Sequence, residues 1–564
     1  MYSGDLKAKL DLTQDELQSI AAIGNVGLYL TFFSGFAFDF LGPHVTSGVA
    51  VVLTLTGYLL MWAGASGVLP GSVGLLSAAA FIWSHGSSWG DLASISVQTR
   101  NFPQDRGLVL GVLKSFFGLS ATVFTVAYDA LFPGNAPAFL LFLAVVTPSL
   151  LLVGGASQRL ATERATTRLS PRGVSRMTFG YLVVVATAIY ATVVVVLIKY
   201  KVLRAGDAGW FVGVLVIVLA FAFVAFPILP CHREEGADAG EYGAINGAGA
   251  SDATESLVHD RERDAGGAAA APEFTAGADT LKDEVTIAGA SLLEGLTSLD
   301  YWLIVMILFA GTGAGLTLIN NVGQLVPALG GDGAAVYVAL LGVGNAFGRM
   351  AFGMASDAFR RVLSRPAWIT ASVLTMALSM LVTAFADLGV LYAAVFLTGF
   401  AYGGFWSLMP AFLADRFGTR SFATLYAFAM LAPAAGSILL GEKLASAVYQ
   451  SNSEHGSKTC IGPECYRATF LILCGLCAVA TAIGGYLTWK TRDTYRALLV
   501  AAGEIDEEEE EEDLGAVAGM GGGENKGAVL GRAGFLGDSP LDTPEVEARR
   551  DARRKRRERQ KARG

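Results

Sequence analysis

Two residues of opposite charge, Asp91 and Lys114, lie inside apolar stretches on either side of a short basic loop. Asp91 precedes Arg100 by nine residues, and Lys114 follows Arg106 by eight. At 1.5 Å per helical residue, both would lie about 12–13 Å inside the same end of a helical bundle. Consecutive helices run antiparallel, so the two side chains can face each other as an ion pair. The pair would be a charge switch linked to a substrate or a proton; the alternatives are a structural pair or a snorkelling lysine.

An arginine of the second half, Arg349, lies eight residues before Asp357, and therefore also about 12 Å inside an edge. Its planar guanidinium suits the recognition of a carboxylate. The alternative is a salt bridge in the neighbourhood of Asp357. A charged group at this depth is costly in a bilayer, which favours a functional role by default.

Three amide side chains, Asn320, Asn321 and Gln324, fall within about one helical turn. They follow a glycine-rich stretch, residues 311–315, that favours close packing or local unwinding. Amides can orient a small polar substrate by hydrogen bonds. The alternative is hydrogen bonding between helices, worth under about 1 kcal/mol per contact on average.

Aromatic and histidine side chains complete the candidate site. His85 and Trp89 share a helix with Asp91, and Tyr402 and Trp406 lie on a later helix. His85 is a candidate proton relay because the pKa of histidine is near neutrality, or else it packs without a role. The aromatic rings are cavity walls or lipid-facing. The candidate cavity residues are His85, Trp89, Asp91, Lys114, Thr317, Asn320, Asn321, Gln324, Asn345, Arg349, Tyr402 and Trp406.

Several classes of chemistry are excluded by what the chain lacks. Its five histidines form no clustered pairs and no HExxH motif, so we expect no metal site. No GxxxxGK[ST] loop occurs, which argues against pumping by a nucleotide site in this chain. No paired catalytic constellation is visible, so we expect neither an enzyme nor a cofactor.

These residues must be positioned by a membrane protein. Hydrophobic residues make up 53% and charged residues 16% of the 564 residues, against about 25% charged in ordinary globular domains. Mean hydropathy is +0.50. Charge is concentrated: residues 504–513 hold nine acidic residues in ten. The net charge of −8 comes from tails and loops and says little about partners.

Thirteen apolar stretches are long enough to cross a hydrocarbon core of about 30 Å. They are 15–41, 44–64, 71–99, 107–131, 136–155, 176–199, 209–229, 300–327, 334–357, 367–387, 389–414, 421–442 and 468–489. Lys and Arg in the loops number 15 on one side and 8 on the other. The positive-inside rule therefore places the first side, with the linker and the C-terminal tail, in the cytoplasm.

The loop before the last stretch contains Cys460 and Cys465. It is the one sizeable non-cytoplasmic loop, where a disulfide can persist; two free thiols are the alternative. Cys474 and Cys477 form a CxxC inside an apolar helix, where packing is favoured over redox chemistry.

The landmarks of the chain occur twice. Gly35-x3-Asp39 ends one helix and Gly353-x3-Asp357 another, 318 residues apart, and basic turns at Arg100 and Arg416 follow 316 residues apart. Equal offsets indicate duplicated halves, as in many secondary transporters. A carboxylate at the membrane edge can bind a helix N-terminus or an arginine and so latch one face. The candidate gate residues are Gly35, Asp39, Gly42, Arg100, Arg106, Gly353, Asp357, Arg360, Arg361, Asp415 and Arg416.

At these motifs the chain resembles the nodulin-like (Nuclear Fusion Defective-like) branch of the major facilitator superfamily. The carrying segments are Asn101-Phe102-Pro103-x2-Arg106-Gly107, Gly111-Val112-Leu113-Lys114-x3-Gly118-Leu119-Ser120, Gly315-Leu316-Thr317-x2-Asn320-Asn321-x-Gly323-Gln324, Asn345-x2-Gly348-Arg349-x3-Gly353-x2-Ser356-Asp357 and Cys460-x-Gly462-x2-Cys465. The resemblance covers roughly residues 1–230 and 296–490.

The resemblance implies an all-α polytopic fold of two pseudo-symmetric bundles plus two extra central helices. Family members have six helices in the first half and this chain has five, so we expect that its first transmembrane helix is missing. One departure is Pro43-His44, where the superfamily usually has basic residues. The latch role of Asp39 is therefore less secure than that of Asp357, for which Arg360 and Arg361 are the expected partners.

We expect five regions along the chain. They are an N-terminal bundle at 1–156, a basic loop with two extra helices at 157–230, a disordered cytoplasmic linker at 231–298, a C-terminal six-helix bundle at 299–490 and a disordered charged tail at 491–564.

The sequence thus predicts a monomeric secondary transporter of a small solute, an organic anion or zwitterion, with protons as a coupling ion and alternating access as the mechanism. Its partners would be the lipid bilayer and the solute, and not nucleic acid. The membrane is the plasma membrane or that of an organelle. The rival hypothesis is a non-transporting sensor or scaffold that binds partners through the linker and the tail.

Overall fold

The computed structural model describes residues 3–160, 169, 171–199, 289–331, 334–452 and 460–501. These residues contain helices and no strands. The described residues up to Tyr495 form the first of two units of the chain. The predicted span at 209–229, nearly all of the predicted linker and most of the tail lie outside the described residues.

Helices α1 to α7 make up the first part of the described chain. They are α1 (Ser3–Leu10), α2 (Gln14–Tyr29), α3 (Phe32–Ser66), α4 (Val73–Asn101), α5 (Arg106–Leu131), α6 (Ala136–Ser157) and α7 (Pro171–Lys199). The second part runs from α12 to α21. It comprises α12 (Leu292–Thr297), α13 (Leu299–Ala328), α14 (Ala335–Ala358), α15 (Arg365–Ala384), α16 (Leu388–Phe417), α17 (Phe422–Ala429), α18 (Leu431–Gly436), the π-helix η2 (Ser437–Leu444), α19 (Ala445–Ser451), α20 (Glu464–Lys490) and α21 (Arg492–Ala501).

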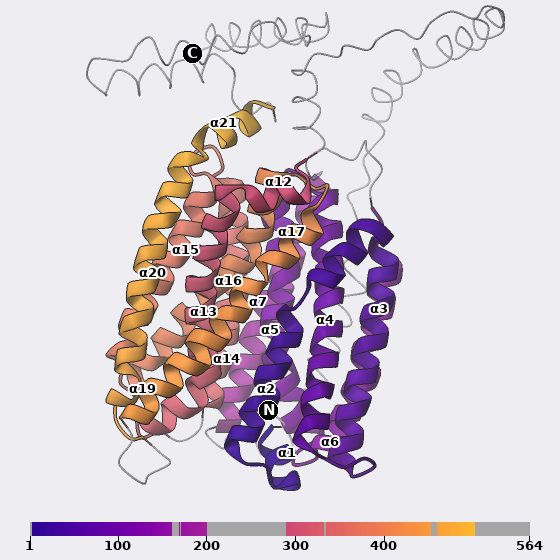
Figure 1. The fold of residues 1–564 in the computed structure, drawn as a ribbon, viewed down its shortest axis with the longest axis vertical. Coiled ribbons are helices and arrows are strands. Elements are labelled where there is room, and N and C mark those ends of the chain that lie inside the picture. The colour runs from indigo at the N-terminus through magenta and orange to yellow at the C-terminus, as the bar shows by residue number, and fades with distance from the viewer. Residues whose placement is uncertain are drawn as a thin grey trace, which may run out of the picture. The chain divides into compact units, whose positions relative to one another are not determined.

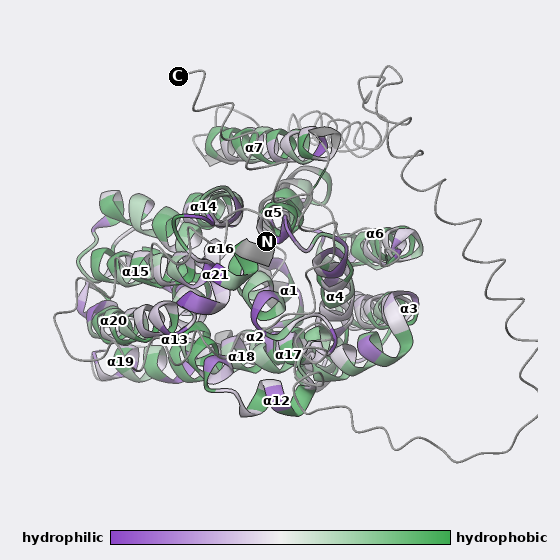
Figure 2. Ribbon diagram, turned by 90° about the horizontal axis from the view of Figure 1, so that it is seen from above, coloured by the Kyte–Doolittle hydropathy of each residue, from purple (hydrophilic) through white to green (hydrophobic). Residues whose placement is uncertain are grey.

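The first unit is a bundle of two halves. Seen along the helices, α3, α4 and α6 lie on one side and α13, α14, α15, α19 and α20 on the other, with α2, α17 and α18 between them (Figure 2). The halves meet where α5 packs on α14 and where α3 packs on α17. Helix α7 lies outside this seam, with Tyr181, Val184 and Ala188 against apolar residues of α5 and α14. The all-α, two-bundle fold predicted from the sequence is thereby confirmed.

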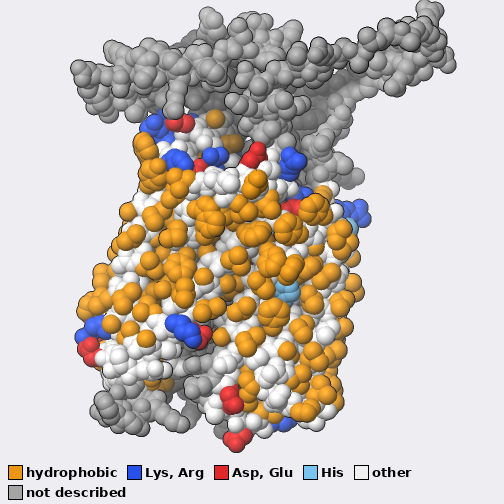
Figure 3. Space-filling model, viewed as in Figure 1, with side chains coloured by type: hydrophobic (Ala, Val, Ile, Leu, Met, Phe, Trp, Pro, Cys, Tyr) orange, Lys and Arg blue, Asp and Glu red, His pale blue; other side chains and the backbone are white. Residues whose placement is uncertain are grey.

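The helices form because long apolar runs are bounded by capping residues. The side chains of Thr13, Ser72, Asn135 and Asp387 accept hydrogen bonds from the first turns of α2, α4, α6 and α16. Hydrophobic side chains cover the middle of the visible face, while charged side chains gather mostly toward its two ends (Figure 3). This distribution is the one that a bilayer-spanning bundle requires.

The two ends of the bundle differ in charge. Arg100, Arg106, Arg365 and Arg416 lie at the end that also carries α12 and α17, at the top of Figure 1. We call this the basic end; it is the side that the sequence predicts to be cytoplasmic. Helices α1 and α19 lie at the opposite end (Figure 1).

Two of the predicted spans are interrupted. The stretch 15–41 breaks between Tyr29 and Phe32, where Thr31 donates a hydrogen bond from its hydroxyl to the carbonyl of Ala427 across the seam, 3.2 Å away. The break from the next span falls at Gly42, whose φ of +82° is easily adopted by glycine, followed by Pro43. The stretch 421–442 is divided into α17, α18 and η2 and continues through α19.

Nine stretches of the described chain are long and apolar enough to cross a membrane, by length and composition. One of them, Ser19–Ser66, covers two predicted spans. Helices α4 and α5 are not among the nine, although they run along the bundle beside the others (Figure 1). Serine and glycine residues lower the hydropathy of α4. The predicted total of thirteen and the missing first helix remain predictions.

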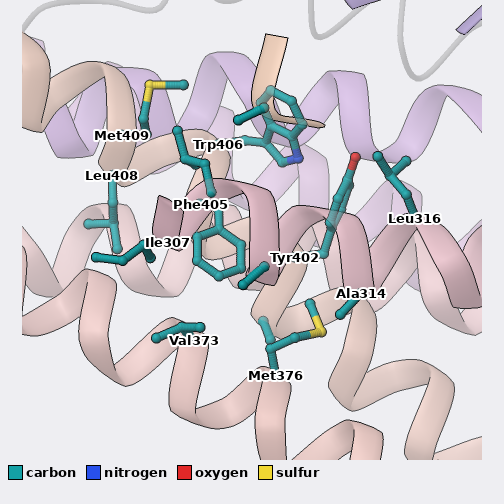
Figure 4. Close-up of a cluster of buried hydrophobic side chains, with 14 of the residues drawn as sticks. Ile307, Ala314, Leu316, Val373, Met376, Tyr402, Phe405, Trp406, Leu408 and Met409 are labelled. Atoms are coloured by element: carbon teal, nitrogen blue, oxygen red, sulfur yellow. The ribbon is translucent and has the colours of Figure 1, made fainter. Parts of the chain in front are cut away.

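The largest buried core belongs mainly to the C-terminal half. Figure 4 shows Phe405 and Leu408 of α16 packed among Ile307 of α13 and Val373 of α15. Trp406 and Tyr402 extend from the same helix α16 (Figure 4). This core fixes the rotation of α16 and therefore the position of its aromatic side chains at the seam.

Candidate transport site and latch at the basic end

Asp91 of α4 and Lys114 of α5 form an ion pair. The ammonium Nζ of Lys114 lies 2.6 Å and 2.8 Å from the two carboxylate oxygens of Asp91. The side chain of Lys114 is 3% exposed and that of Asp91 is 29% exposed. Lys114 is therefore buried rather than extended to the membrane edge, while Asp91 keeps an accessible carboxylate.

Arg349 of α14 is buried at the seam between the halves. Its Nε donates to Oδ1 of Asn345 and its Nη1 to the backbone carbonyl of Lys114, both at 2.9 Å. Within the part of the chain that the structure describes, no carboxylate lies within ion-pair distance of this guanidinium. A salt bridge near Asp357, the alternative considered above, is therefore not formed.

Two aromatic rings lie beside both cations. The ring of Phe117 is 5.7 Å from Lys114 Nζ and 5.3 Å from Arg349 Cζ, and the ring of Trp406 is 5.6 Å and 5.8 Å from the same atoms. Contacts of this kind stabilise a desolvated cation by about 2 kcal/mol. Asp91, Lys114, Phe117, Arg349 and Trp406 are called the cationic cluster below, because they hold two positive charges and one negative charge.

Tyr29 of α2 and Tyr402 of α16 lie next to this cluster. Their hydroxyl oxygens are 3.4 Å apart across the seam. The Tyr29 ring is stacked 6.3 Å from that of Trp406, and the Tyr402 ring meets the Trp406 ring edge-on at 5.6 Å. The position of Trp406 is thus set by both halves.

A cavity of about 790 Å³ lies mainly in the N-terminal half and extends away from the basic end. Its lining residues are Leu6, Leu17, Ile20, Ala21, Gly24, Asn25, Leu28, Tyr58, Met61, Ala80, Trp83, Ser84, Ser87, Phe117, Ser120, Phe124, Leu143, Thr147, Asn320, Gly323 and Gln324. Of the twelve residues proposed from the sequence, Asn320 and Gln324 line it. Phe117, a member of the cationic cluster, also lines the cavity, so its ring lies between the cavity and the two cations.

The amide groups are largely used between helices. Asn320 donates to the hydroxyl of Ser437 at 3.3 Å, and Asn321 donates to the carbonyls of Thr317 and Gly441. The carbonyl oxygen of Gln324 accepts from the hydroxyl of Tyr466 at 3.0 Å. Thr317 is fully buried and bonds its own helix. Asn321 and Thr317 therefore serve packing against η2, whereas Asn320 and Gln324 also face the cavity.

The basic end is closed by Asp39 in the first half. Its carboxylate accepts hydrogen bonds from the backbone N–H of Thr424 at 3.0 Å and from the Thr424 hydroxyl at 2.7 Å. Thr424 lies in the first turn of α17, where a negative charge is favoured by the helix dipole. Arg100 pairs with the same carboxylate at 2.7 Å. Gly35 allows this approach, because a Cβ there would lie 2.8 Å from the carbonyl of Ala423.

Asp357 makes the equivalent contact in the opposite direction. Its carboxylate accepts from the backbone N–H of Leu108 in the first turn of α5 at 2.7 Å. The arginine that pairs with it is Arg365, at 3.0 Å, and neither Arg360 nor Arg361, which the sequence suggested. Arg360 instead donates to the carbonyl of Gln104, and Arg361 is exposed. The turn after α14 directs those two side chains away from the carboxylate.

Asp415 joins the two halves between these contacts. It accepts from Arg106 of α5 and from Arg365 of α15, each at 2.6 Å. Arg416 turns away and pairs with Asp300 at 2.8 Å. We call the contacts of Asp39, Asp357 and Asp415 the latch. Three latch pairs join the two halves at the basic end, Asp39–Thr424, Arg106–Asp415 and Asp357–Leu108, and the pair Arg360–Gln104 joins them there as well.

Comparisons with known proteins match this arrangement. A family model described as Nodulin-like matches residues 1–229, and one described as the NFD4 C-terminal domain matches residues 285–497. The chain belongs to the nodulin-like, NFD4-like family. The protein NUCLEAR FUSION DEFECTIVE 4 of Arabidopsis thaliana is 22% identical over 520 residues, covering 88% of this chain and 86% of that protein.

More distant similarities were also found. The probable transporter MCH1 of Yarrowia lipolytica is 28% identical over 211 residues, which cover 35% of this chain and 43% of that protein. The proton:xylose symporter XylE is 13% identical with a TM-score of 0.48, covering 85% of this chain and 89% of XylE. The human organic anion transporter MFSD10 is 15% identical with a TM-score of 0.44, covering 86% of this chain and 88% of MFSD10.

His85 of this nodulin-like chain has both ring nitrogens engaged. Trp89 donates its indole N–H to Nε2 at 3.0 Å, so the hydrogen of the neutral ring lies on Nδ1, which donates to the carbonyl of Gly27 at 3.1 Å. We expect His85→Asn to keep the donor to Gly27, to change uptake less than about threefold and to leave the pH profile of uptake unaltered. Initial rates between pH 5.5 and 8 check this. A profile that loses its pH dependence in the variant would instead identify His85 as a proton relay.

Two glycines let the halves of the latch touch. A Cβ at Gly107 would lie 2.5 Å from the carbonyl oxygen of Gly353 and 2.8 Å from Oδ1 of Asp357. Because overpacking of this kind costs about 1–3 kcal/mol, Gly107→Ala should lower the uptake rate by about tenfold or more. Gly48→Ala, which meets no atom within 4 Å, is the matched control. Equal uptake rates in the two variants would show that contact at Gly107 is not needed.

The opposite end carries a covalent link. Cys460 and Cys465 are joined by a disulfide, and the backbone N–H of Gly462 between them donates to the carbonyl of Ala328 at 2.8 Å. This loop is therefore held against the end of α13. Cys474 and Cys477 are unbonded to each other, and Cys477 is buried, as expected for a packing role.

The sequence did not single out several residues of the site. Four residues make contacts on which the site depends, yet no motif in the sequence identifies them. They are Tyr29, Phe117, Arg365 and Thr424. Arg365 and Thr424 are detectable in retrospect as a basic residue and a hydroxyl near the start of a helix, where they can meet the repeated aspartates.

Proposed function

We propose that this protein is a secondary transporter that works by alternating access. The observation that carries the proposal is the reciprocal latch, in which Asp39 holds the first turn of α17 and Asp357 holds that of α5. Both contacts join the two halves at the basic end, whereas the cavity extends toward the opposite end. A rocking motion of one half against the other would break both contacts at the basic end and close the cavity at the opposite end.

The substrate that fits the cationic cluster is a small organic anion. The cluster contains two buried cations and a single carboxylate, that of Asp91, so it has an excess of one positive charge. Arg349 donates one N–H to the side-chain amide oxygen of Asn345 and another to the backbone carbonyl of Lys114, and neither neutral acceptor balances its positive charge. An anion would complete the charge balance in this desolvated place. A zwitterion would need a second carboxylate for its ammonium group, and Asp91 is already paired.

Proton coupling follows from the same pair. An anion that binds Lys114 competes with Asp91 for the ammonium group. Once the pair is loosened, the partly exposed carboxylate of Asp91 is free to bind a proton that moves with the anion. The half that moves would then carry the anion and the proton together, and uptake would rise with an inwardly directed proton gradient.

Uptake into proteoliposomes tests the proposal. Labelled organic anions, amino acids and sugars are offered with and without a pH gradient, with empty liposomes as the control. We expect accumulation of at least one anion, stimulation by external acid and no accumulation of sugars. Accumulation of neutral sugars alone would refute the anion part, and counterflow of no solute would refute transport.

The rival function, a sensor or scaffold that acts through the charged tail, is separated by truncation. A chain ending at residue 501 keeps every latch and cluster residue. The transporter proposal predicts that it retains the uptake of the full chain. Loss of all function on truncation, together with unimpaired function of cluster variants, would favour the rival.

A further inference from the structure

Two buried hydrogen-bond donors beside the cationic cluster are unused. Trp406 is 7% exposed and Tyr426 is 2% exposed. Within the described chain, neither the indole Nε1 of Trp406 nor the hydroxyl of Tyr426 has a hydrogen-bond partner. The Trp406 nitrogen lies near the hydroxyl of Tyr402 but outside hydrogen-bond geometry. A buried donor left unpaired costs about 1–3 kcal/mol, so two at one place call for an explanation.

Both donors belong to the cationic cluster or lie close to it. The Trp406 ring contacts the charged groups of Lys114 and Arg349 at 5.6 Å and 5.8 Å. Tyr426, on α17, is close enough to Asp91 and Arg349 to interact with their charges. The two unused donors therefore come from different helices of the same half, and both lie near Arg349.

The hydrogen-bonding groups of the cluster are unbalanced. Lys114 and Arg349 can only donate, and so can the Trp406 indole. Asp91 is engaged by Lys114 and Asn345 by Arg349, which leaves the hydroxyl oxygen of Tyr426 as an unengaged acceptor. The place is thus rich in donors and poor in free acceptors. A ligand that matches it must bring more than one acceptor oxygen and no ammonium group.

We propose that the cationic cluster is a binding site for a carboxylate that carries an additional acceptor oxygen, such as a 2-oxo acid. The carboxylate would pair with Lys114 and Arg349, and the additional oxygen would accept from Trp406 Nε1 and the Tyr426 hydroxyl. This inference rests on the proposed function and narrows its substrate class. An oxo group fits better than a hydroxyl, because a hydroxyl would bring a further donor into a place where acceptors are scarce.

Phe117 gives the ligand a route to this site. Its ring is 46% exposed, lines the cavity and lies 5.3 Å from Arg349 Cζ and 5.7 Å from Lys114 Nζ. A rotation of this side chain would join the cavity to the cluster. The ligand would enter from the cavity and displace the ring from the cations.

Matched pairs of acids test the inference on the full chain in lipid nanodiscs. Dissociation constants are measured for propionate and pyruvate, and for glutarate and 2-oxoglutarate, which differ within each pair by one oxo group. We expect the oxo acid of at least one pair to bind at least tenfold more tightly than its partner. Trp406→Phe and Tyr426→Phe should each bring that ratio to below about threefold, whereas the exposed-ring controls Trp489→Phe and Tyr486→Phe should leave it unchanged.

The outcomes separate this inference from the proposed function. Equal binding within both pairs, with acids still transported, overturns the second-acceptor site and leaves the transporter standing. A preference for the oxo acid that persists in both Trp406→Phe and Tyr426→Phe also overturns it. Binding of none of the four acids, while another solute accumulates in proteoliposomes, overturns the site and the anion preference but not transport. Thermal unfolding of each variant shows whether it is folded.

Discussion

Replacing Asp357 with alanine should open the basic end and abolish most transport. The variant loses the bond to the Leu108 N–H in the first turn of α5 and leaves Arg365 with one carboxylate, Asp415. Removing one member of a buried pair costs about 3–5 kcal/mol, and a carboxylate at a helix N-terminus is worth up to about 2 kcal/mol. Because only the bond to Leu108 joins the two halves, up to about 2 kcal/mol is lost from the latched state alone, and the equilibrium between the two states should shift by up to about 30-fold.

The measurement is the reactivity of a single cysteine at Thr99, in a background whose unpaired cysteines are serine. Thr99 is fully buried at the basic end, so its cysteine should be protected in the latched state. We expect Asp357→Ala to raise the rate of its reaction with a membrane-impermeant thiol reagent at least tenfold.

Asp387→Ala is the matched control, because Asp387 also accepts from a first-turn N–H, that of Val390, but within one half. It should lower stability without changing the reactivity of the cysteine at Thr99. Protection that is equal in Asp357→Ala and the parent would mean that the carboxylate does not hold the latch.

The second large effect is expected for Arg349→Ala. Truncation removes the buried guanidinium that we propose pairs with the substrate carboxylate. A charge-assisted bond of this kind is worth about 2–5 kcal/mol, so the affinity for the transported anion should fall by about 30-fold to several thousand-fold. Arg349→Lys keeps the charge but not the planar fork, and should recover part of this affinity.

The affinity is measured as the Kd of the purified protein for the anion identified by uptake. Arg467→Ala, which removes an arginine paired with Glu464 on the opposite surface, is the control and should bind the anion normally. Because Arg349 also bonds Asn345 and the carbonyl of Lys114, thermal unfolding must show that the variant is folded. A folded Arg349→Ala protein with unchanged Kd would exclude the carboxylate role.

Depth along a helix was readable from the sequence, but rotation about the helix axis was not. Asp91 and Lys114 were placed at one depth by counting residues from Arg100 and Arg106, and they do pair. Whether a residue faces the cavity depends on its rotation, which changes by about 100° per residue. Asn320 lines the cavity, whereas its neighbour Asn321 bonds to the backbone of η2.

For the latch, too, the sequence predicted the aspartates but not their partners. The repeated Gly-x3-Asp pattern marked Asp39 and Asp357, because duplicated halves repeat their landmarks. Their partners depend on which first turn lies across the seam, and that contact joins residues more than two hundred positions apart. Arg360 and Arg361 are nearer to Asp357 in the sequence, yet it is the side chain of Arg365, at the start of α15, that pairs with Asp357.

Hydropathy likewise could not predict where the helices are interrupted. Apolar periodicity continues through Leu30 and Thr31 and through η2, so each appears as an unbroken span. The breaks are made by tertiary contacts, such as the bond from Thr31 to Ala427 and the bond from Asn321 to Gly441. Such contacts at helix irregularities are common at functional sites in membrane proteins.

Alternation between two states is tested most directly by distances between spin labels in nanodiscs. One pair, Leu160 with Val362, spans the halves at the basic end, and the other, Val68 with Ile461, spans them at the opposite end; three of the four side chains are more than 60% exposed and Leu160 is 42% exposed. On addition of the transported anion at acidic pH, the first distance should lengthen in part of the molecules while the second shortens. Saturating anion that binds, yet leaves both distance distributions unchanged, would contradict alternating access.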